Sequence, residues 1–272
     1  MDLTTLIGIF AGVIVVFVGI IWGKEGINIG EIVNFYDISS IFITFGGSIL
    51  MVVASTPIRV LKKIGSHMKI AFLGKKQDPM IAINAIVEYA QMARKSGLLA
   101  LEEKANQETE PFLQSAILLI VDAVDSEKLR SMLENELENM DTRHAESISM
   151  YERGAAFGPA FGMIGTLIGL IKMLRNLNAG DADALAEGMS VALITTFYGS
   201  LFANIICAPI ASKLQGHHDA EMLYKTIILE GVLSIQSGEN PKYIREKLVS
   251  FLAQNQRTDV NKKDKGSSDD KE

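Results

Sequence analysis

The sequence is poor in charge, in cysteine and in basic excess. Only 21% of its 272 residues are charged while 48% are hydrophobic, and a mean hydropathy of +0.23 is too apolar for an ordinary soluble domain. The single cysteine, Cys207, excludes a disulfide-stapled secreted domain, and the apolar content excludes a disordered chain. A net charge of -6 lacks the basic field that nucleic-acid binding requires. We therefore expect a membrane protein with no nucleic-acid partner.

Charge-free stretches of the length of a membrane-spanning helix occur in the sequence. Crossing about 30 Å of hydrocarbon takes about 20 apolar residues without a charge in the middle. The stretches that meet this requirement are residues 3–22, 35–54, 154–174 and 189–211. A signal peptide is the alternative for the first, but Asp2 stands where a basic segment is expected and no Ala-x-Ala pattern follows. We expect an all-α, polytopic membrane protein with four transmembrane helices and a helical cytoplasmic domain.

Cations and composition indicate the topology. The segment after the second stretch is rich in Lys and Arg, whereas the short connections at 23–34 and 175–188 carry few cations. By the positive-inside bias, this places the 55–153 segment and both termini in the cytoplasm. The predicted organisation is two transmembrane helices in 1–54, a cytoplasmic helical domain in 55–153, two transmembrane helices in 154–211, a cytoplasmic helical extension in 212–254 and a disordered tail in 255–272.

Proline and capping residues predict the helix boundaries of the cytoplasmic segments. We expect the helix that begins at Ser126 to run directly into the third span, because no Pro or Gly intervenes before Gly154. The fourth span is expected to continue to Gly238. The other expected helices run from Asp78-Pro79 to Gly97, from Leu98 onward, from Glu110-Pro111 to Val124 and from Asn240-Pro241 to about Ala253.

The spans lack an acid at mid-membrane depth. Asp37 lies at the edge of the second span, so a carboxylate relay for protons or cations cannot be built from this chain alone. The third and fourth spans instead carry hydroxyls, at Thr166, Thr195 and Thr196. Such hydroxyls commonly bond back to a carbonyl one turn earlier, and Pro159 removes a backbone donor, which predicts a kink or hinge. Together these residues are typical of one wall of a cation path whose acid lies elsewhere.

Small residues recur at helical spacing in the same two spans. Helix packing is the simplest interpretation of this pattern. The glycines concerned are Gly158, Gly162, Gly165 and Gly169 in the third span and Gly199 in the fourth. The run is not a G-x-G-x-x-G motif, and the chain has no G-x-S-x-G, H-E-x-x-H or paired-cysteine motif. We therefore expect no catalytic site, no metal site and no cofactor.

Three separated motifs carry a resemblance to a known family. They are ARKSGLLALEE at 93–103, GPAFGMIGTLIGLIKML at 158–174 and ALITTFYGSLFANIICAPIA at 192–211. With a large cytoplasmic segment between the second and third spans, they resemble the MotA/PomA stator subunit of the bacterial flagellar motor, in the MotA/TolQ/ExbB proton channel family. The resemblance covers nearly all of residues 1–253. The related ExbB and TolQ proteins have three spans, so the expected first span argues against them.

The resemblance implies a multi-pass protein of the bacterial inner membrane that couples the flow of Na⁺ or H⁺ to torque. Five copies of such a subunit surround the single spans of two MotB/PomB-like B subunits, each of which contributes one membrane aspartate. This implication matches the missing carboxylate. The resemblance also implies that Pro159 and Pro209 are tied to ion flow and conformational change.

The resemblance further implies a contact with the rotor protein FliG. Arg94 and Glu102 match the charged pair that engages FliG, while Lys95 and Glu103 match further charged positions of the PomA branch. The simpler interpretation of Arg94 and Glu102 is a pair of solvated surface charges, worth about 0–1 kcal/mol.

The threonines bear on which ion is transported. Thr166, Thr195 and Thr196 match the sodium-driven members, and a hydroxyl oxygen is a suitable ligand for a hard cation. We expect Na⁺, with H⁺ as the alternative. Two other classes of function remain open at this point, an ExbB/TolQ-like energiser of envelope transport and a non-transporting membrane scaffold.

Overall fold

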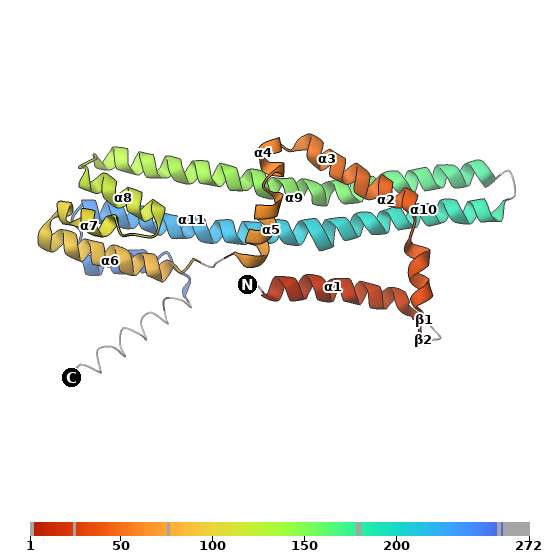
Figure 1. The fold of residues 1–272 in the computed structure, drawn as a ribbon, viewed down its shortest axis with the longest axis horizontal. Coiled ribbons are helices and arrows are strands. Elements are labelled where there is room, and N and C mark those ends of the chain that lie inside the picture. Colours follow the sequence, from red (N-terminus) through yellow and green to blue (C-terminus); the bar gives the residue numbers. More distant parts are fainter. Residues whose placement is uncertain (1–2, 24–25, 75–76, 178–180, 255–256, 258–272) are drawn as a thin grey trace. The chain divides into compact units, whose positions relative to one another are not determined.

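The computed structural model describes residues 3–23, 26–74, 77–177, 181–254 and 257. Two compact units make up the chain (Figure 1). The first unit comprises Met1–Lys75 and Arg143–His217, and the second comprises Lys76–Thr142 and His218–Glu272. Two long helices, α9 (Ser126–Leu177) and α11 (Ala208–Gln236), contribute residues to both units. The predicted uninterrupted run from Ser126 into the third span is therefore confirmed.

The first unit contains most of the apolar helices. Its N-terminal part consists of α1 (Leu3–Ile21), β1 (Trp22–Gly23), β2 (Gly26–Ile27), η1 (Ile29–Phe35), α2 (Ile38–Ile41), η2 (Phe42–Gly46), α3 (Gly47–Ser55), α4 (Ile58–Leu61) and α5 (Ile64–Leu73). The two short strands pair antiparallel, with Trp22 opposite Ile27. Its C-terminal part consists of the adjoining portion of α9, α10 (Ala182–Leu201), η4 (Phe202–Cys207) and the beginning of α11.

Helical stretches long and apolar enough to cross a membrane are found among the described residues. Three of them qualify, within Ile38–Ser55, Ser126–Arg175 and Ala182–Gln236. Ile7–Ile21 of α1 is also apolar but is shorter than these stretches. The helical membrane fold is thus confirmed, while the count of four spans stays a prediction.

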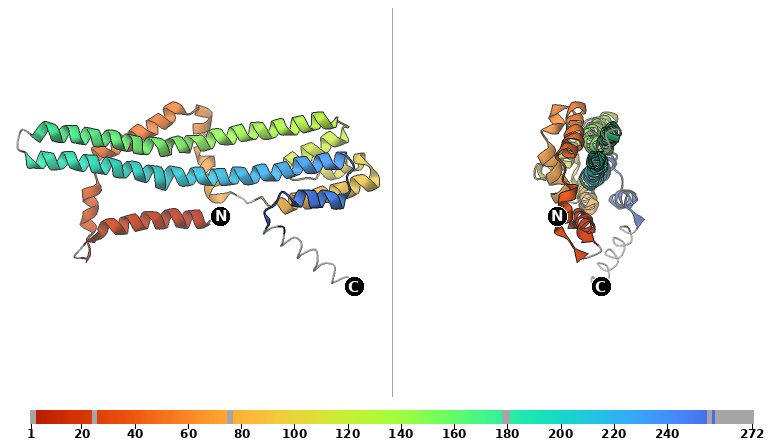
Figure 2. Two further views of the ribbon diagram at one scale, coloured as in Figure 1. Left: turned by 180° about the vertical axis from the view of Figure 1, so that it is seen from behind. Right: turned by 90° about the vertical axis from the view of Figure 1, so that its right-hand side faces the viewer.

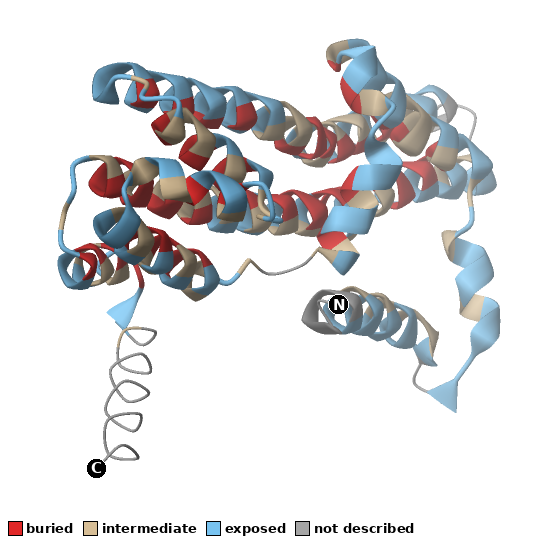
Figure 3. Cartoon of the chain, turned by 60° about the vertical axis from the view of Figure 1, so that its left-hand side comes forward, coloured by how far each residue is buried: buried red, intermediate tan, exposed pale blue. Residues whose placement is uncertain are grey.

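The second unit is a helical domain with its own core. It consists of α6 (Pro79–Ser96), η3 (Leu98–Leu101), α7 (Glu102–Ala105), α8 (Pro111–Val121) and α12 (Pro241–Val249), together with the adjoining portions of α9 and α11. Buried residues gather where the helices of a unit face one another (Figure 3). The largest fully buried side chains of this core include Tyr89, Ile86, Leu113, Leu133 and Ile228.

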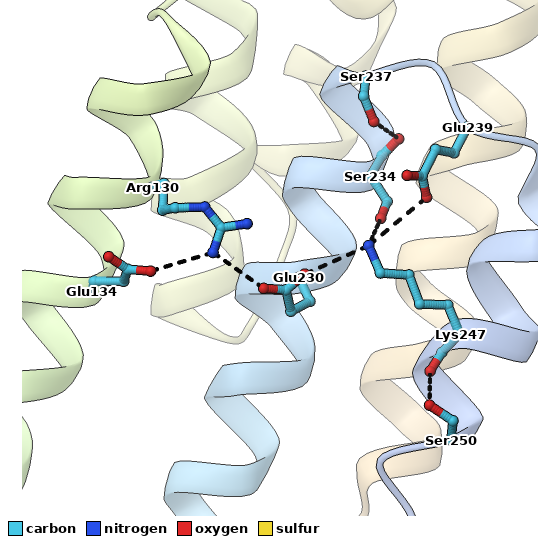
Figure 4. A network of polar contacts seen from close by, with 8 residues as sticks. All are labelled: Arg130, Glu134, Glu230, Ser234, Ser237, Glu239, Lys247 and Ser250. Carbon is cyan, nitrogen blue, oxygen red and sulfur yellow. Dashed lines mark hydrogen bonds and ion pairs between the residues drawn. The ribbon is translucent and has the colours of Figure 1, made fainter.

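Charged residues join three helices of the second unit (Figure 4). Glu230 of α11 accepts from Arg130 of α9 at 3.3 Å and pairs with Lys247 of α12 at 3.5 Å. Arg130 also pairs with Glu134, and Lys247 donates to the Ser234 hydroxyl at 3.1 Å. Glu230 therefore links α9 and α12 through one carboxylate.

Local capping explains where most helices begin. Asp78 accepts from the Met80 N–H at 2.9 Å, and Asn240 accepts from the Lys242 N–H at 3.0 Å, so both predicted starts are confirmed. The second apolar helix begins at Ile38 and not at residue 35, because Asp37 caps it by accepting from the Ser40 N–H at 2.6 Å. Likewise, Asp181 caps α10 at Ala182, well before the predicted start at residue 189.

The helix ends differ modestly from the predicted ones. The structure ends α8 at Val121, short of Val124, and α12 at Val249, short of Ala253. Gly97 ends α6 as predicted, in the left-handed region at φ 84° that favours glycine. The predicted disordered tail lies, apart from Arg257, outside the described residues.

Two π-helical turns, η2 and η4, lie among the described apolar helices, and neither includes Pro159. Helix α9 continues through Pro159 without a break, and the kink or hinge expected there stays a prediction. The π-helical turn η4 ends at Cys207, two residues before Pro209, and the Ala208 N–H donates to the Ala203 carbonyl five residues earlier. Proline lacks the N–H that an α-helix would direct to residue 205, and a wider turn accommodates this loss.

Candidate ion pathway and rotor-facing surface

Glycines let α9 and α10 approach each other closely. The five predicted packing glycines are all buried. A Cβ atom built on Gly199 would lie 2.4 Å from the Gly158 carbonyl oxygen, and one built on Gly169 would lie 2.4 Å from the Gly188 carbonyl oxygen. The same two helices run side by side in Figure 1 and in the left-hand view of Figure 2. The backbones of α9 and α10 therefore meet at distances that side chains at these positions would prevent.

A hydroxyl pair bridges the two helices beside this contact. The Thr166 and Thr196 hydroxyl oxygens are 2.7 Å apart. Both lie near the Ala192 carbonyl oxygen, at 3.1 Å for Thr166 and 3.2 Å for Thr196, and Thr166 is also 3.1 Å from the Gly162 carbonyl oxygen. Four oxygen atoms from two helices are thus gathered in one place.

The adjacent threonines of α10 point in different directions. Thr195 is fully buried, and its hydroxyl bonds back to the carbonyls of Val191 and Ala192 at 2.9 and 3.1 Å. Thr196 is exposed on this chain, as are Ser200 and Asn204 at successive four-residue intervals. Because polar side chains are costly against lipid, an exposed polar stripe in an apolar helix pair indicates a surface that meets another protein or water.

The second apolar helix also carries buried hydroxyl side chains, which were not predicted as site residues from the sequence. Ser40, Thr44 and Ser48 are all fully buried at four-residue spacing. The Thr44 hydroxyl donates to the Thr195 carbonyl at 3.3 Å, and the Ser48 hydroxyl donates to the Phe157 carbonyl at 3.2 Å. These two bonds connect the second apolar helix to both α10 and α9. The i, i+4, i+8 repeat of hydroxyls in an apolar run was the signal available in the sequence.

The two predicted pathway prolines differ in environment. Pro159 is exposed on α9, whereas Pro209 is half-buried. Pro209 lines a cavity of about 350 Å³ together with Gly8 and Gly12 of α1 and Asn204 of η4. A Cβ atom added at either of these glycines would meet nothing within 4 Å. The irregular turn before Pro209 therefore lies beside open space.

The four charged residues predicted for the rotor contact lie around one helical connection. Arg94 and Lys95 occupy the last turn of α6, and Glu102 and Glu103 occupy the first turn of α7. All are exposed, and none makes an ion pair within the described part of the chain. The two positive charges lie at the C-terminus of α6 and the two negative charges at the N-terminus of α7, where the helix dipole favours each sign.

Tyr89 and Lys104 hold this connection in place. The Tyr89 hydroxyl donates to the Lys104 carbonyl at 3.3 Å or to the Glu108 carboxylate at 3.2 Å. Lys104 lies 5.1 Å from the centre of the Tyr89 ring and pairs with Glu88 of α6. Burial, followed by the Glu108 charge, raises the pKa of Tyr89, so this hydroxyl stays protonated as a donor. These contacts fix the end of α6 relative to α7, and with it the backbone that carries the four exposed charges.

Over the described ranges, no group of three or more His, Cys, Asp or Glu side chains is placed to hold a metal ion. The oxygen atoms gathered at the α9–α10 contact belong to hydroxyls and backbone carbonyls.

These features define a multi-span helical membrane protein whose closely packed helices present an uncharged, oxygen-bearing surface. The family model of the MotA/TolQ/ExbB proton channel family matches residues 104–227. Motility protein A of Borreliella burgdorferi is 39% identical over 96% of this chain and 98% of that protein. Chemotaxis protein PomA of Vibrio alginolyticus is 38% identical over 94% of this chain and 98% of that protein. The chain belongs to the MotA/TolQ/ExbB proton channel family.

Solved structures agree with this membership. The flagellar MotAB stator complex from Bacillus subtilis contains a chain that matches with a TM-score of 0.83 and 29% identity, over 95% of this chain and 99% of that one. The C. jejuni MotAB structure matches with a TM-score of 0.82 and 28% identity, over 93% and 97% of the two chains. The recognised resemblance is therefore confirmed across nearly the whole length.

Proposed function

We propose that this chain is the A subunit of a bacterial flagellar stator, a multi-pass inner-membrane protein that couples cation flow to torque on the rotor. The observation that carries the proposal is the exposed Thr166–Thr196 hydroxyl pair on spans that hold no acid at mid-depth. Such a surface is half of an ion site, and a partner has to supply the charge. A MotB/PomB-like B subunit with a membrane aspartate supplies it in this scheme. The relatives named Motility protein A and the MotAB structures support this assignment.

Sodium is the proposed ion, with H⁺ as the alternative. Hard cations take oxygen ligands, and the Thr166 hydroxyl, the Thr196 hydroxyl and the Ala192 carbonyl lie within 3.2 Å of one another. An entering Na⁺ exchanges the hydroxyl–hydroxyl bond for two ligands and gains a carboxylate from the partner. A proton needs only that carboxylate and water, so it makes no use of the pair.

Torque is proposed to leave the chain through the α6–α7 connection. Ion binding and release shift a ring of A subunits, five copies in the family's assembly, around the B-subunit spans. The exposed charges of Arg94, Lys95, Glu102 and Glu103 pass that motion to FliG electrostatically. In this scheme the chain performs no catalytic step and needs no resident cofactor.

Charge reversal tests the rotor contact. Cells whose only A subunit carries Arg94→Glu together with Glu102→Lys should assemble stators but lose most of their torque, as measured by the rotation of tethered cells. Lys128→Glu, at another exposed site of the same unit, is the matched control and should rotate as wild type does. Normal torque in the double variant would remove the rotor assignment.

The alternative functions make different predictions. An ExbB/TolQ-like energiser of envelope transport would leave a deletion strain fully motile. A scaffold whose glycines only mediate assembly would leave ion-dependent rotation unchanged in Thr166→Ala and Pro159→Leu. The stator proposal requires a non-motile deletion strain and altered ion dependence in the threonine variant.

A further inference from the structure

A stretch without any acidic residue follows the second apolar helix. Between Asp37 and Asp78 the sequence contains no Asp or Glu, but it contains Arg59, Lys62, Lys63, Lys69, Lys75 and Lys76. Among the described residues, Arg59 lies in α4, Lys62 and Lys63 connect α4 to α5, and Lys69 lies in α5. Both helices follow α3, which ends at Ser55. Positive charge is therefore concentrated where the chain leaves the membrane.

One side of α4 and α5 is packed against the rest of the first unit. Val60 and Ala71 belong to a buried cluster with Tyr151 of α9 and Ile210 of α11. His67 is also buried on this side, and its ring lies 6.0 Å from that of Tyr151. The orientation of both short helices is fixed by these contacts, so the opposite side is presented outward.

The outward side mixes lysines with large apolar side chains. Ile58 is 71% exposed, Ile70 42% and Leu73 49%, with Lys62 and Lys69 exposed between them. Arg59 pairs with Glu146, but over the described residues neither Lys62 nor Lys69 has an ion-pair partner. Alternating apolar and basic side chains at a membrane boundary are suited to the interface between acyl chains and headgroups.

We propose that the outer side of α4 and α5 binds the anionic phospholipid headgroups of the cytoplasmic leaflet. Ile58, Ile70 and Leu73 insert at the boundary of the acyl chains, while Lys62 and Lys69 reach the lipid phosphates. The site holds a layer of acidic lipid around the A subunit and anchors the segment that connects the spans to the cytoplasmic domain. It follows from the membrane placement of the chain and is independent of the stator role.

The lipid preference of the purified chain tests the proposal. The full chain in neutral detergent is mixed with equal amounts of phosphatidylglycerol and phosphatidylcholine, and native mass spectrometry measures the ratio of the two lipids bound per chain. We expect enrichment in phosphatidylglycerol that declines with salt. In Lys62→Gln/Lys69→Gln the enrichment should fall by about fivefold per lysine, because each basic residue near an anionic surface contributes about 1 kcal/mol. Lys63 is kept because its charge acts on His67.

Matched variants make the result specific. Lys128→Gln/Lys242→Gln changes the net charge equally at exposed sites of the other unit and should keep the wild-type ratio. Lys62→Arg/Lys69→Arg should also keep it, because the charge is retained. The proposal is overturned if the glutamine variant binds phosphatidylglycerol as wild type does, or if inorganic phosphate displaces more of the lipid than sodium chloride of the same ionic strength does. If Lys62→Gln/Lys69→Gln bound lipid as wild type does but lost torque in cells, the surface would be assigned to a protein partner instead.

Discussion

Substituting Gly199 by alanine should separate α9 from α10. The added Cβ atom would lie 2.4 Å from the Gly158 carbonyl oxygen, 3.0 Å from its carbonyl carbon and 3.3 Å from the Pro159 Cα atom. All three are backbone atoms, so no side-chain rotation relieves the clash. Reaching the 3.4 Å of ordinary contact requires the helices to move apart by about 1 Å. Overpacking of this kind costs about 1–3 kcal/mol.

The displacement should also affect the proposed ion site. Moving the two helices apart by the same amount would lengthen the Thr166–Thr196 distance from 2.7 Å to about 3.7 Å, beyond hydrogen bonding. We therefore expect Gly199→Ala both to lower stability and to impair ion-dependent rotation. Stability is measured by titrating the purified protein with sodium dodecyl sulfate in mixed micelles and following helix content.

Gly46→Ala is the matched control for this experiment. Gly46 lies in a membrane helix, and a Cβ atom there would meet nothing within 4 Å. Alanine at this position should leave the unfolding midpoint unchanged or raise it slightly, because alanine favours helix more than glycine does. If Gly199→Ala unfolded at the same detergent fraction as Gly46→Ala, the inferred backbone contact between α9 and α10 would be wrong.

Three further predictions concern stability at His67, Asp37 and Glu230. Burial, then the charges of Lys63 and His144, lower the pKa of His67, so its stabilising effect should be complete above pH 6.5 and decrease as the pH falls. His67→Asn should flatten this dependence in thermal unfolding between pH 5 and 8, and parallel curves would contradict it. Asp37→Ala should cost about 1 kcal/mol by removing the cap of α2, whereas Asn at this site should cost little. Glu230→Ala should destabilise the second unit by about 1 kcal/mol, because Glu230 pairs with Arg130 of α9 and with Lys247 of α12. Glu134→Ala should cost less, because Glu134 pairs with Arg130 of its own helix.

Local signals in the sequence predicted much of the fold. Capping residues such as Asp78 and Asn240 act on the adjacent N–H groups, and charge-free runs report the surrounding solvent directly. The same local physics was missed at Asp37 and Asp181, where hydropathy set the predicted boundary and the carboxylate cap set the real one. The π-turn before Pro209 was not predicted because a proline alone does not say how the neighbouring helix adjusts.

The candidate site was predictable in composition but not in orientation. Thr195 and Thr196 are consecutive in a helix and must point about 100° apart, so the sequence could not show which one faces outward. The roles of Ser48 and Thr44 depend on bonds to α9 and α10, which are distant in sequence. The glycine pattern, in contrast, predicted a close helix contact, and the structure places that contact between α9 and α10.

The rotation speed of tethered cells as a function of Na⁺ concentration, at fixed pH, tests the central claim most directly. The strain should contain this chain as its only A subunit, with Thr166→Ala as the comparison. We predict that speed rises with Na⁺ and saturates in the wild type, and that this dependence is lost or shifted in the variant. Rotation independent of Na⁺ would contradict the sodium site formed by Thr166 and Thr196, and no rotation at any ion concentration would contradict the stator role itself.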